Sequence, residues 1–377
     1  MQPTASTSPK PASVQYTEYG IPIRNLWHMC LYAWNEVPLK NHWTLDVAEE
    51  APTLDALLAS ILVRLIQQRL RIGLGRSYVN EHQSIRGIRG RIDFAESLKQ
   101  QAFEQGQAVC EFQQYSANAP KNQIIRSTLT RLVQIGNFGP DHTQANELSH
   151  TLRMLTRALD GVDLIELKLD FIRRQQFDRN DVDYHLMMAI CELILLRQMP
   201  SEQGAELGLP ALDRDALILY NIYERFVANF YRIHLHGWKV VRQKQLDWHD
   251  KSQNRLMPSL RPDLVLEELT TGRMLILDTK FTAQNLVTNP WGKRTFDSSH
   301  LYQIYTYLRT QEHLSEPHSR ATGILLYPTV DHNLSENIEL ENHTIRIESI
   351  DLTAQWQNIE QELLYIINKE VAKNNIQ

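Results

Sequence analysis

Three charged side chains in one short segment have the types and spacing that phosphodiester chemistry needs. The segment LRPDLVLEELTTGRMLILDTKFTAQ (residues 260–284) consists of two apolar runs joined by the polar turn LTTG, and it contains Asp263, Asp278 and Lys280. If the turn closes an antiparallel hairpin, Asp263 lies directly opposite Asp278, with Cβ atoms about 5 Å apart. Because side chains alternate between the faces of a strand, Lys280 lies on the same face as Asp278. The pattern predicts that the three charges meet on one patch.

The opposite face of this predicted hairpin is apolar and is expected to pack on a helix. It carries Leu264, Leu266, Leu275, Leu277 and Phe281. The sheet that contains the hairpin is therefore expected to have a core face and a reactive face.

Two opposed carboxylates repel each other unless a cation lies between them. Mg²⁺, with Mn²⁺ as a substitute, suits such a pair, since it is held by one or two carboxylates and keeps several waters. Asp263 and Asp278 are then the metal ligands, and Lys280 is the catalytic lysine that orients a water and stabilises charge developing on a phosphate. The alternative is structural, with an ion pair between Asp263 and Lys280, or with Arg261 paired to the acids.

Two further polar side chains could complete this site. Glu224 lies in the aromatic sequence YERF of an expected helix, where a buried carboxylate is costly unless it binds a metal or pairs. An ion pair with Arg225 or a neighbour explains Glu224 equally well. Gln303 and Tyr307, in HLYQIYTYL, lie one turn apart on one face of another expected helix. Gln303 could position a water or a phosphate, or belong to an ordinary polar helix face.

Basic side chains that could contact DNA or a partner occur in two segments. The sequence NPWGKR (289–294) is predicted to be a loop that offers Lys293 and Arg294 to a nucleic-acid backbone. The segment 61–91 is rich in arginine, and its glycine-containing part SIRGIRGRIDF (84–94) carries Arg86, Arg89 and Arg91. For both segments, a solvated surface is the alternative. The net charge of −5 excludes binding of nucleic acid over the whole surface, since phosphate contacts need clustered Lys and Arg.

The bulk composition indicates a soluble cytoplasmic protein of two domains. A length of 377 residues exceeds the usual size of one hydrophobic core. The three cysteines are far apart and form no CxxC or His/Cys cluster, which argues against disulfides and a zinc site. The longest apolar run, LMMAICELILL (186–196), is too short to cross a bilayer, so no membrane span is expected. Residues 1–18 are expected to form a disordered tail.

The order of the expected elements predicts an α/β (α+β) fold. Helices are expected over 54–72, 121–136, 145–159 and 181–198, and the stretch 200–210, with two prolines and two glycines, is the candidate linker. A helix over 215–235, strands over 238–246, 260–268, 273–281 and 321–327, and helices over 299–310 and 353–371 follow. This order predicts a mainly helical amino-terminal domain (19–205) with some strands, expected around 84–94, followed by a mixed sheet flanked by helices (206–377).

The chain resembles the McrC family, the nuclease component of McrBC-type modification-dependent restriction systems. RPDLVLE, LILDTKF, HLYQIYTYL and GILLYPTVD (323–331) are similar to the PD-(D/E)xK nuclease domain of that family. IPIRNLWHMCLYAW (21–34), IRGIRGRIDFAESL (85–98) and NQIIRSTL (122–129) are similar to its amino-terminal signatures and occur in the expected order. The resemblance covers about residues 20–370.

The resemblance implies a DNA endonuclease subunit that acts with a GTP-hydrolysing, McrB-like AAA+ ring, which recognises modified double-stranded DNA and is stimulated by this subunit. Asp263 and Asp278 match the metal ligands, Lys280 the catalytic lysine and Gln303 the family's glutamine, whereas the match of Glu224 is weaker. Residues 19–205 would dock on the ring. The chain contains no G-x-x-x-x-G-K-[ST] loop, so no nucleotide site is expected on it. A stand-alone nuclease of the same fold and a non-cleaving adaptor of an AAA+ ring are the alternatives.

Overall fold

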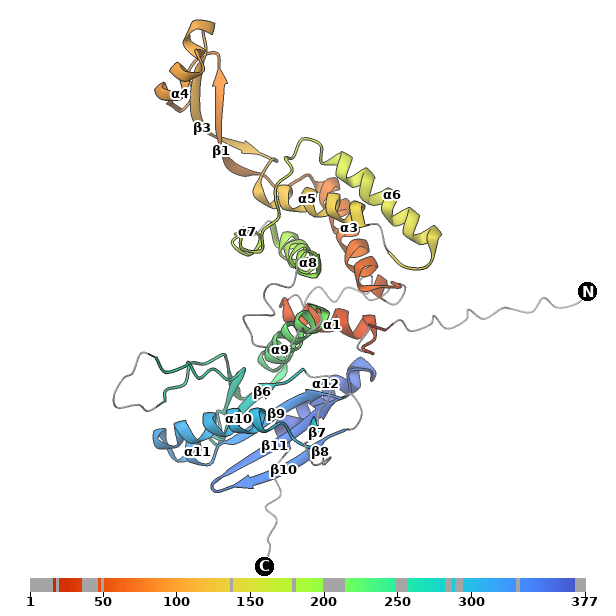
Figure 1. The fold of residues 1–377 in the computed structure, drawn as a ribbon, viewed down its shortest axis with the longest axis vertical. Coiled ribbons are helices and arrows are strands. Elements are labelled where there is room, and N and C mark those ends of the chain that lie inside the picture. The colour runs from red at the N-terminus through yellow and green to blue at the C-terminus, as the bar shows by residue number, and fades with distance from the viewer. Residues whose placement is uncertain are drawn as a thin grey trace, which may run out of the picture. The chain divides into compact units, whose positions relative to one another are not determined.

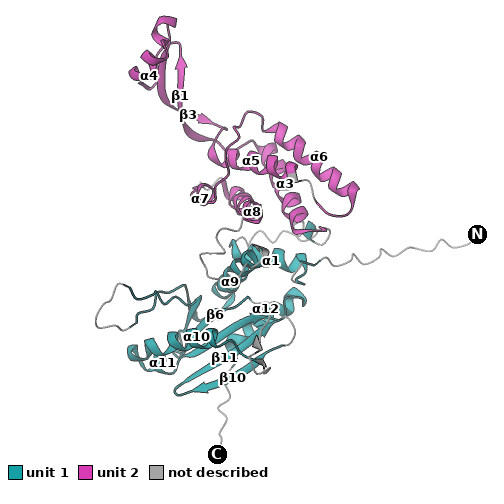
Figure 2. Ribbon diagram, viewed as in Figure 1, with its two compact units in different colours: residues 1–49, 201–377 teal, residues 50–200 magenta. Residues whose placement is uncertain are grey.

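The chain folds into two compact units. The computed structural model describes residues 16–17, 20–35, 47–48, 51–135, 138–177, 181–198, 214–248, 256–281, 287–288, 294–329 and 333–369. Residues 1–49 and 201–377 form unit 1, and residues 50–200 form unit 2 (Figure 2). The predicted linker (200–210) and all of the predicted tail except residues 16–17 lie outside the described residues.

The body of unit 2 is helical, as predicted. It contains α3 (Leu54–Ile72), α5 (Pro120–Ile135), α6 (His142–Ala158), α7 (Leu169–Arg173) and α8 (Val182–Gln198). Helix α3 has the predicted bounds because local signals set both of its ends. The Thr53 hydroxyl accepts a hydrogen bond from the amide of Ala56, and Gly73 follows the last turn with a positive φ of 97°.

A small sheet extends from this helical body as an arm, defined here as residues 76–116 (Figure 1). Strands β1 (Ser77–Ile85) and β3 (Ala108–Ser116) pair antiparallel along their whole length, and β2 (Arg91–Ile92) pairs with the other edge of β3. Helix α4 (Phe94–Lys99) and the 3₁₀ turn η2 (Ala102–Gln105) connect β2 to β3. Only the piece around 84–94 was predicted to be strand-like. The rest escaped prediction because β1 is mostly polar and its partner lies far along the chain.

Unit 1 is built on a mixed sheet, as predicted for the carboxy-terminal part, and six described strands form this sheet. The strand order is β10-β11-β9-β6-β5-β4, with β4 (Trp238–Arg242), β5 (Leu264–Glu268), β6 (Met274–Thr279), β9 (Thr322–Pro328), β10 (Ser335–Leu340) and β11 (His343–Ile350). The central pairs β6/β9 and β9/β11 are parallel, and the outer pairs are antiparallel. Strands β10 and β11 were not predicted. A separate pair is formed by β7 (Val287–Thr288) and β8 (Arg294–Thr295).

Helices cover both faces of this sheet (Figure 1). One face packs on α9 (Arg214–His234) and α12 (Trp356–Asn368), which are joined by a hydrogen bond from the Tyr231 hydroxyl to the carbonyl of Leu363. The other face packs on α10 (Ser298–Gln311), followed by η4 (Glu312–Leu314) and α11 (Glu316–Ser319). Gly323 in β9 permits the close approach of α10, because a Cβ there would lie 2.8 Å from Cγ1 of Ile304.

The prediction of one core face and one reactive face was wrong in part. The predicted apolar face is buried, with Leu264, Leu266, Leu275 and Leu277 at most 2% exposed. The face of the charges is also apolar over most of its length, because Val265 and Ile276 pack with Ile304 and Leu308 of α10. The charged residues are confined to one end of the hairpin, beyond this second core.

The compact units differ from the predicted domains in one segment. Residues 19–49 were expected in the amino-terminal domain, but they group with unit 1. The reason is α1 (Ile23–Ala33), whose side chains are almost all buried. Asn25 donates hydrogen bonds to the carbonyls of Leu352 and Ala354, and the ring of Tyr32 packs on Phe226 of α9. Tertiary contacts therefore tie this early segment to residues more than 190 positions away.

In the part of the chain that the structure describes, no helix is long and apolar enough to span a bilayer.

Candidate active site

The two acidic residues lie where the predicted hairpin register places them. The turn LTTG forms, and Gly272 adopts a positive φ of 73°. Leu264 pairs with Leu277 and Val265 with Ile276, so the same register sets Asp263, one residue before β5, opposite Asp278 in β6. Both carboxylates are buried, with Asp263 8% and Asp278 3% exposed. Burial and the geometry of the turn thus bring two acids together at the end of the hairpin.

Lys280 is bound to one of these acids and is held by a helix on the other side. Its Nζ lies 2.5 Å from Oδ2 of Asp278 and donates to Oε1 of Gln303 over 2.7 Å. The Gln303 amide in turn donates to the Tyr307 hydroxyl over 2.8 Å. Helix α10 therefore positions the ammonium group of Lys280 through Gln303. The alternative ion pair between Asp263 and Lys280 is not formed, and Arg261 contacts Gln245 instead of the acids.

The electrostatics of the site disfavour two ionised carboxylates. Burial raises the pKa of Asp263, and the charges of Asp278 and Glu224 raise it further, against the hydrogen bonds from Thr279 that lower it. Burial also raises the pKa of Asp278, and the ammonium group of Lys280 counters this effect only in part. Mutual repulsion in a buried place is the situation that a bound cation relieves.

The donor set fits a hard divalent cation. In the described ranges, no group of three or more His, Cys, Asp or Glu side chains could hold a metal. Mg²⁺ does not need such a group, because one or two carboxylates and several waters suffice. Oδ2 of Asp263 accepts from Thr279 and Oδ2 of Asp278 contacts Lys280, while no described hydrogen bond reaches Oδ1 of either acid. Each acid thus retains one oxygen for a cation.

Glu224 lies close to the acids but has other partners. It is 7% exposed on α9, and its charge raises the pKa of both Asp263 and Asp278. Its Oε1 accepts a hydrogen bond of 2.8 Å from Gln243 and one of 3.2 Å from Arg242. The expected structural partner was Arg225 or a neighbour, and the structure supplies Arg242 and Gln243 instead.

Several polar residues around the acids were not singled out from the sequence. Thr279 donates both its amide and its hydroxyl to Oδ2 of Asp263, at 2.7 and 2.5 Å. Burial and the nearby acids raise the pKa of Tyr220 on α9. His300, in the first turn of α10, shares a hydrogen bond of 2.9 Å with the Tyr327 hydroxyl. Thr279 is the middle residue of the D-x-K motif, and this position was a sequence signal that could have identified it. Tyr220, His300 and Tyr327 reach the site only through tertiary packing.

The basic residues that were candidates for contacts with DNA or a partner differ in their exposure and in their pairing. Arg86, Arg89 and Arg91 are exposed in the arm, and the guanidinium of Arg89 stacks over the Phe112 ring at 4.3 Å. Lys293 lies outside the described residues, and Arg294, predicted in a loop, begins the short strand β8. Arg69, in the arginine-rich segment 61–91, does not belong to the basic surface, because it is buried and paired with Asp181 and Asp183.

Comparisons with known proteins agree with the predicted resemblance. A family model described as McrBC 5-methylcytosine restriction system component matches residues 6–328. The chain is 26% identical to the Type IV methyl-directed restriction enzyme EcoKMcrBC of Escherichia coli (strain K12), over 93% of this chain and 98% of the relative. Its fold is similar to a chain in a half-complex from the tetradecameric assembly of Thermococcus gammatolerans McrB AAA+ hexamers with bound McrC. That match has a TM-score of 0.54 and 16% identity, and it covers 92% of this chain and 75% of the other.

Proposed function

Because the chain belongs to the McrC family, the McrBC 5-methylcytosine restriction system component, we propose that it is the Mg²⁺-dependent DNA endonuclease subunit of such a system. It acts in the cytoplasm with a GTP-hydrolysing AAA+ partner, whose hydrolysis it stimulates, on modified double-stranded DNA. The observation that carries the nuclease assignment is the pair of buried, opposed carboxylates with Lys280 bound beside them.

In this proposal each residue at the end of the hairpin has one role. Asp263 and Asp278 hold the cation, which supplies Lewis acidity and lowers the pKa of a water when bound. Lys280 donates to a phosphate oxygen and stabilises the negative charge that develops there. Gln303 holds the Lys280 ammonium group in place, and Tyr307 holds Gln303. Glu224 adds negative charge beside the acids and favours cation binding.

The partner role is supported by family membership and by the distribution of chemistry over the chain. No phosphate-binding loop occurs in the sequence, so nucleotide hydrolysis belongs to another chain. The related Thermococcus gammatolerans assembly contains McrB AAA+ hexamers with bound McrC. We assign docking on the ring to unit 2 (residues 50–200), the part of the predicted amino-terminal domain that folds apart from the nuclease sheet. We assign contacts with the partner or DNA to Arg86, Arg89, Arg91, Lys293 and Arg294.

Cleavage and stimulation can be separated by one substitution. Asp278→Asn removes a cation ligand but keeps the size of the side chain, so DNA cleavage with partner, GTP and Mg²⁺ should be lost while stimulation of GTP hydrolysis is retained. Glu267→Gln is the matched control, because Glu267 lies on the same hairpin and pairs with Lys239 away from the acids. Unchanged cleavage by Asp278→Asn would refute the site and favour an adaptor. Cleavage by the purified chain without any partner would favour a stand-alone nuclease.

A further inference from the structure

The arm is joined to the helical body of unit 2 at two points. The chain enters the arm after Gly75 and leaves it at Ala117. Within the described residues, β1, β2, β3, α4 and η2 pack chiefly on one another. The arm also has a small core of its own, formed by Ala108, Cys110 and Phe112 with Ile85 and Ile92. The direction of the arm therefore depends on what holds the chain at its two points of attachment.

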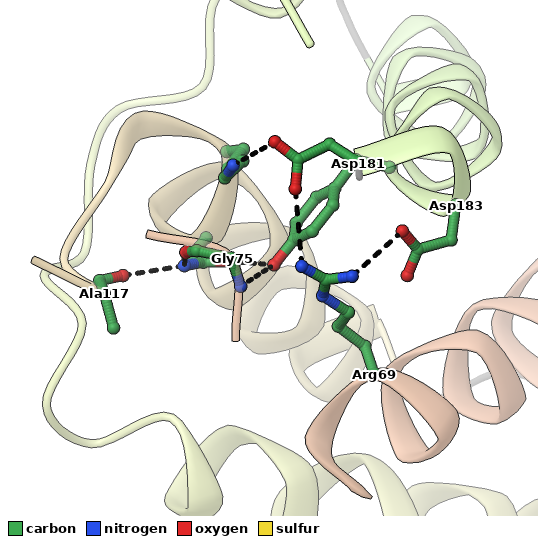
Figure 3. A network of polar contacts seen from close by, with 8 residues as sticks. Arg69, Gly75, Ala117, Asp181 and Asp183 are labelled. Atoms are coloured by element: carbon green, nitrogen blue, oxygen red, sulfur yellow. Dashed lines mark hydrogen bonds and ion pairs between the residues drawn. The ribbon is translucent and has the colours of Figure 1, made fainter. Parts of the chain in front are cut away.

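One side chain holds both points. Asn122, fully buried in the first turns of α5, donates one hydrogen bond to the carbonyl of Gly75 over 2.8 Å and another to the carbonyl of Ala117 over 2.7 Å (Figure 3). A primary amide has two donors, and both are used here. The entry and the exit of the arm are thereby fixed to the same atom of one helix.

A second side chain completes the attachment at the entry. The Tyr184 hydroxyl on α8 donates to Oδ1 of Asn122 over 2.6 Å and accepts from the amide of Gly75 over 3.0 Å. Both polar groups of the Gly75 backbone are therefore bound by buried side chains from two helices. Asn118 secures the exit in addition, since its Oδ1 accepts from the amide of Asp163 over 2.8 Å.

Buried charges fix Tyr184 in turn. Asp181 pairs with Lys121 over 2.5 Å and with Arg69 over 3.3 Å, and Arg69 also reaches Asp183 over 3.3 Å (Figure 3). Both cations lie within reach of the Tyr184 ring, Arg69 at 4.8 Å and Lys121 at 5.0 Å from its centre. Charges buried in this way require their partners, because an unpaired buried charge is very unfavourable. The ring of Tyr184 is thus held in one position.

The absence of a side chain at Gly75 is part of the same arrangement. A Cβ at this position would lie 2.8 Å from Cε of Lys121 and 2.9 Å from Oδ1 of Asp181. The backbone at the entry of the arm therefore lies directly against the buried ion pair. Any larger residue would displace the groups that hold Tyr184.

We propose that Asn122 and Tyr184 are positioning residues that lock the arm to the helices of unit 2, so that the arm docks on the AAA+ partner in one preset direction. The second half of this statement rests on the proposed function. We call the hydrogen bonds of Asn122 and Tyr184 to the two ends of the arm the lock. If these hydrogen bonds are lost, the arm keeps its own sheet but samples many directions. Only a fraction of the molecules then hold the arm in the direction that binds the partner, and the apparent affinity for the partner is the intrinsic affinity multiplied by that fraction. Maximal stimulation at saturation is retained, because the surface of the arm is unchanged.

The direction of the arm can be measured with spin labels at Gln83 and His150, which are exposed on β1 and α6. Labels go to cysteines introduced there, because the three native cysteines are buried. Tyr184→Phe removes the hydroxyl but keeps the ring, and Asn122→Ala removes both donors. Thr130→Val is the matched control, because the Thr130 hydroxyl binds only Arg126 of its own helix among the described residues. Circular dichroism and a thermal melt check that each variant folds.

The lock predicts a wider distance distribution for folded Tyr184→Phe and Asn122→Ala than for wild type and Thr130→Val. The amide of Gly75 should exchange its hydrogen on the order of tenfold faster in Tyr184→Phe. An unchanged distribution in folded Tyr184→Phe would overturn the lock, whether or not Asn122→Ala folds.

Titration of the partner's GTP hydrolysis tests the functional half. The concentration for half-maximal stimulation should rise on the order of tenfold, with the maximum kept. A wider distribution with unchanged half-maximal concentration would overturn the docking role of the lock. If wild type stimulates no partner, the proposed function fails, while the distance measurement still decides the lock.

Discussion

Replacing one of the two opposed acids should abolish cleavage and stabilise the metal-free protein. In Asp263→Asn, the side-chain oxygen still accepts the hydrogen bonds that Thr279 donates to Asp263, so the packing is kept. At about 5 Å and an effective dielectric constant of about 20, two carboxylates repel by roughly 3 kcal/mol. The contact of Lys280 with Asp278 offsets part of this repulsion. We therefore expect a gain of about 1–2 kcal/mol, or a melting temperature a few degrees higher.

Tryptophan fluorescence is a selective assay for this effect. All seven tryptophans lie in residues 1–49 and 201–377, so their emission follows the unfolding of unit 1 and not of unit 2. Melts in EDTA compare Asp263→Asn with wild type, and Glu267→Gln controls for the loss of a negative charge on the same hairpin. Addition of Mg²⁺ should then raise the melting temperature of wild type more than that of Asp263→Asn, because a ligand stabilises the state that binds it.

Two results would refute this reasoning. The first is that folded, inactive Asp263→Asn melts in EDTA at or below the melting temperature of wild type, because the two acids then do not repel each other in the wild-type protein. Equal stabilisation of both proteins by Mg²⁺ would mean that the cation binds elsewhere.

Four further substitutions test the site and the elements that position it. Lys280→Met should slow single-turnover cleavage by about 100-fold or more, and Gln303→Ala by only about tenfold, because Gln303 acts through Lys280; a larger effect of Gln303→Ala would contradict this order. Asp297→Ala should destabilise unit 1 by about 1 kcal/mol, since the side chain of Asp297 caps α10. The hydrogen bonds from Ser299 lower the pKa of Asp297 in the folded protein, so this stabilisation is present above the pKa of the unfolded state and is lost as pH falls through the pKa of the folded state. The melting temperatures of wild type and Asp297→Ala, measured by fluorescence, should therefore converge below about pH 4. A difference in melting temperature that persists at lower pH would exclude the charged cap. Gly323→Ala should cost about 1–3 kcal/mol and reduce cleavage by displacing α10, whereas unchanged melting would show that α10 adapts freely.

The hairpin register followed from the sequence alone because every signal that sets it is local. The length of the LTTG turn and the alternation of apolar residues fix which positions pair, and the structure confirms the pairing of Leu264 with Leu277. Helix α3 was predicted for the same reason, since its apolar stripe, the acidic residue in its first turn and the glycine after its last turn all lie within one short segment. The family resemblance, carried by short motifs in order, was confirmed by the matching family model.

Tertiary structure decided the rest, because the interacting groups are distant in the sequence. Arg69 has the sequence context of a surface arginine, but its partner Asp181 lies 112 positions away and draws it into the interior. Strand β1 carries mostly polar residues and becomes a strand only by pairing with β3. The polar partners of Lys280 and Glu224 likewise come from other elements. The sequence by itself determined which acids and which lysine share one end of a hairpin, since a turn and a period of two suffice for that. Only the folded chain determined what covers, pairs and orients them, because burial and long-range hydrogen bonds exist only once distant segments have packed together.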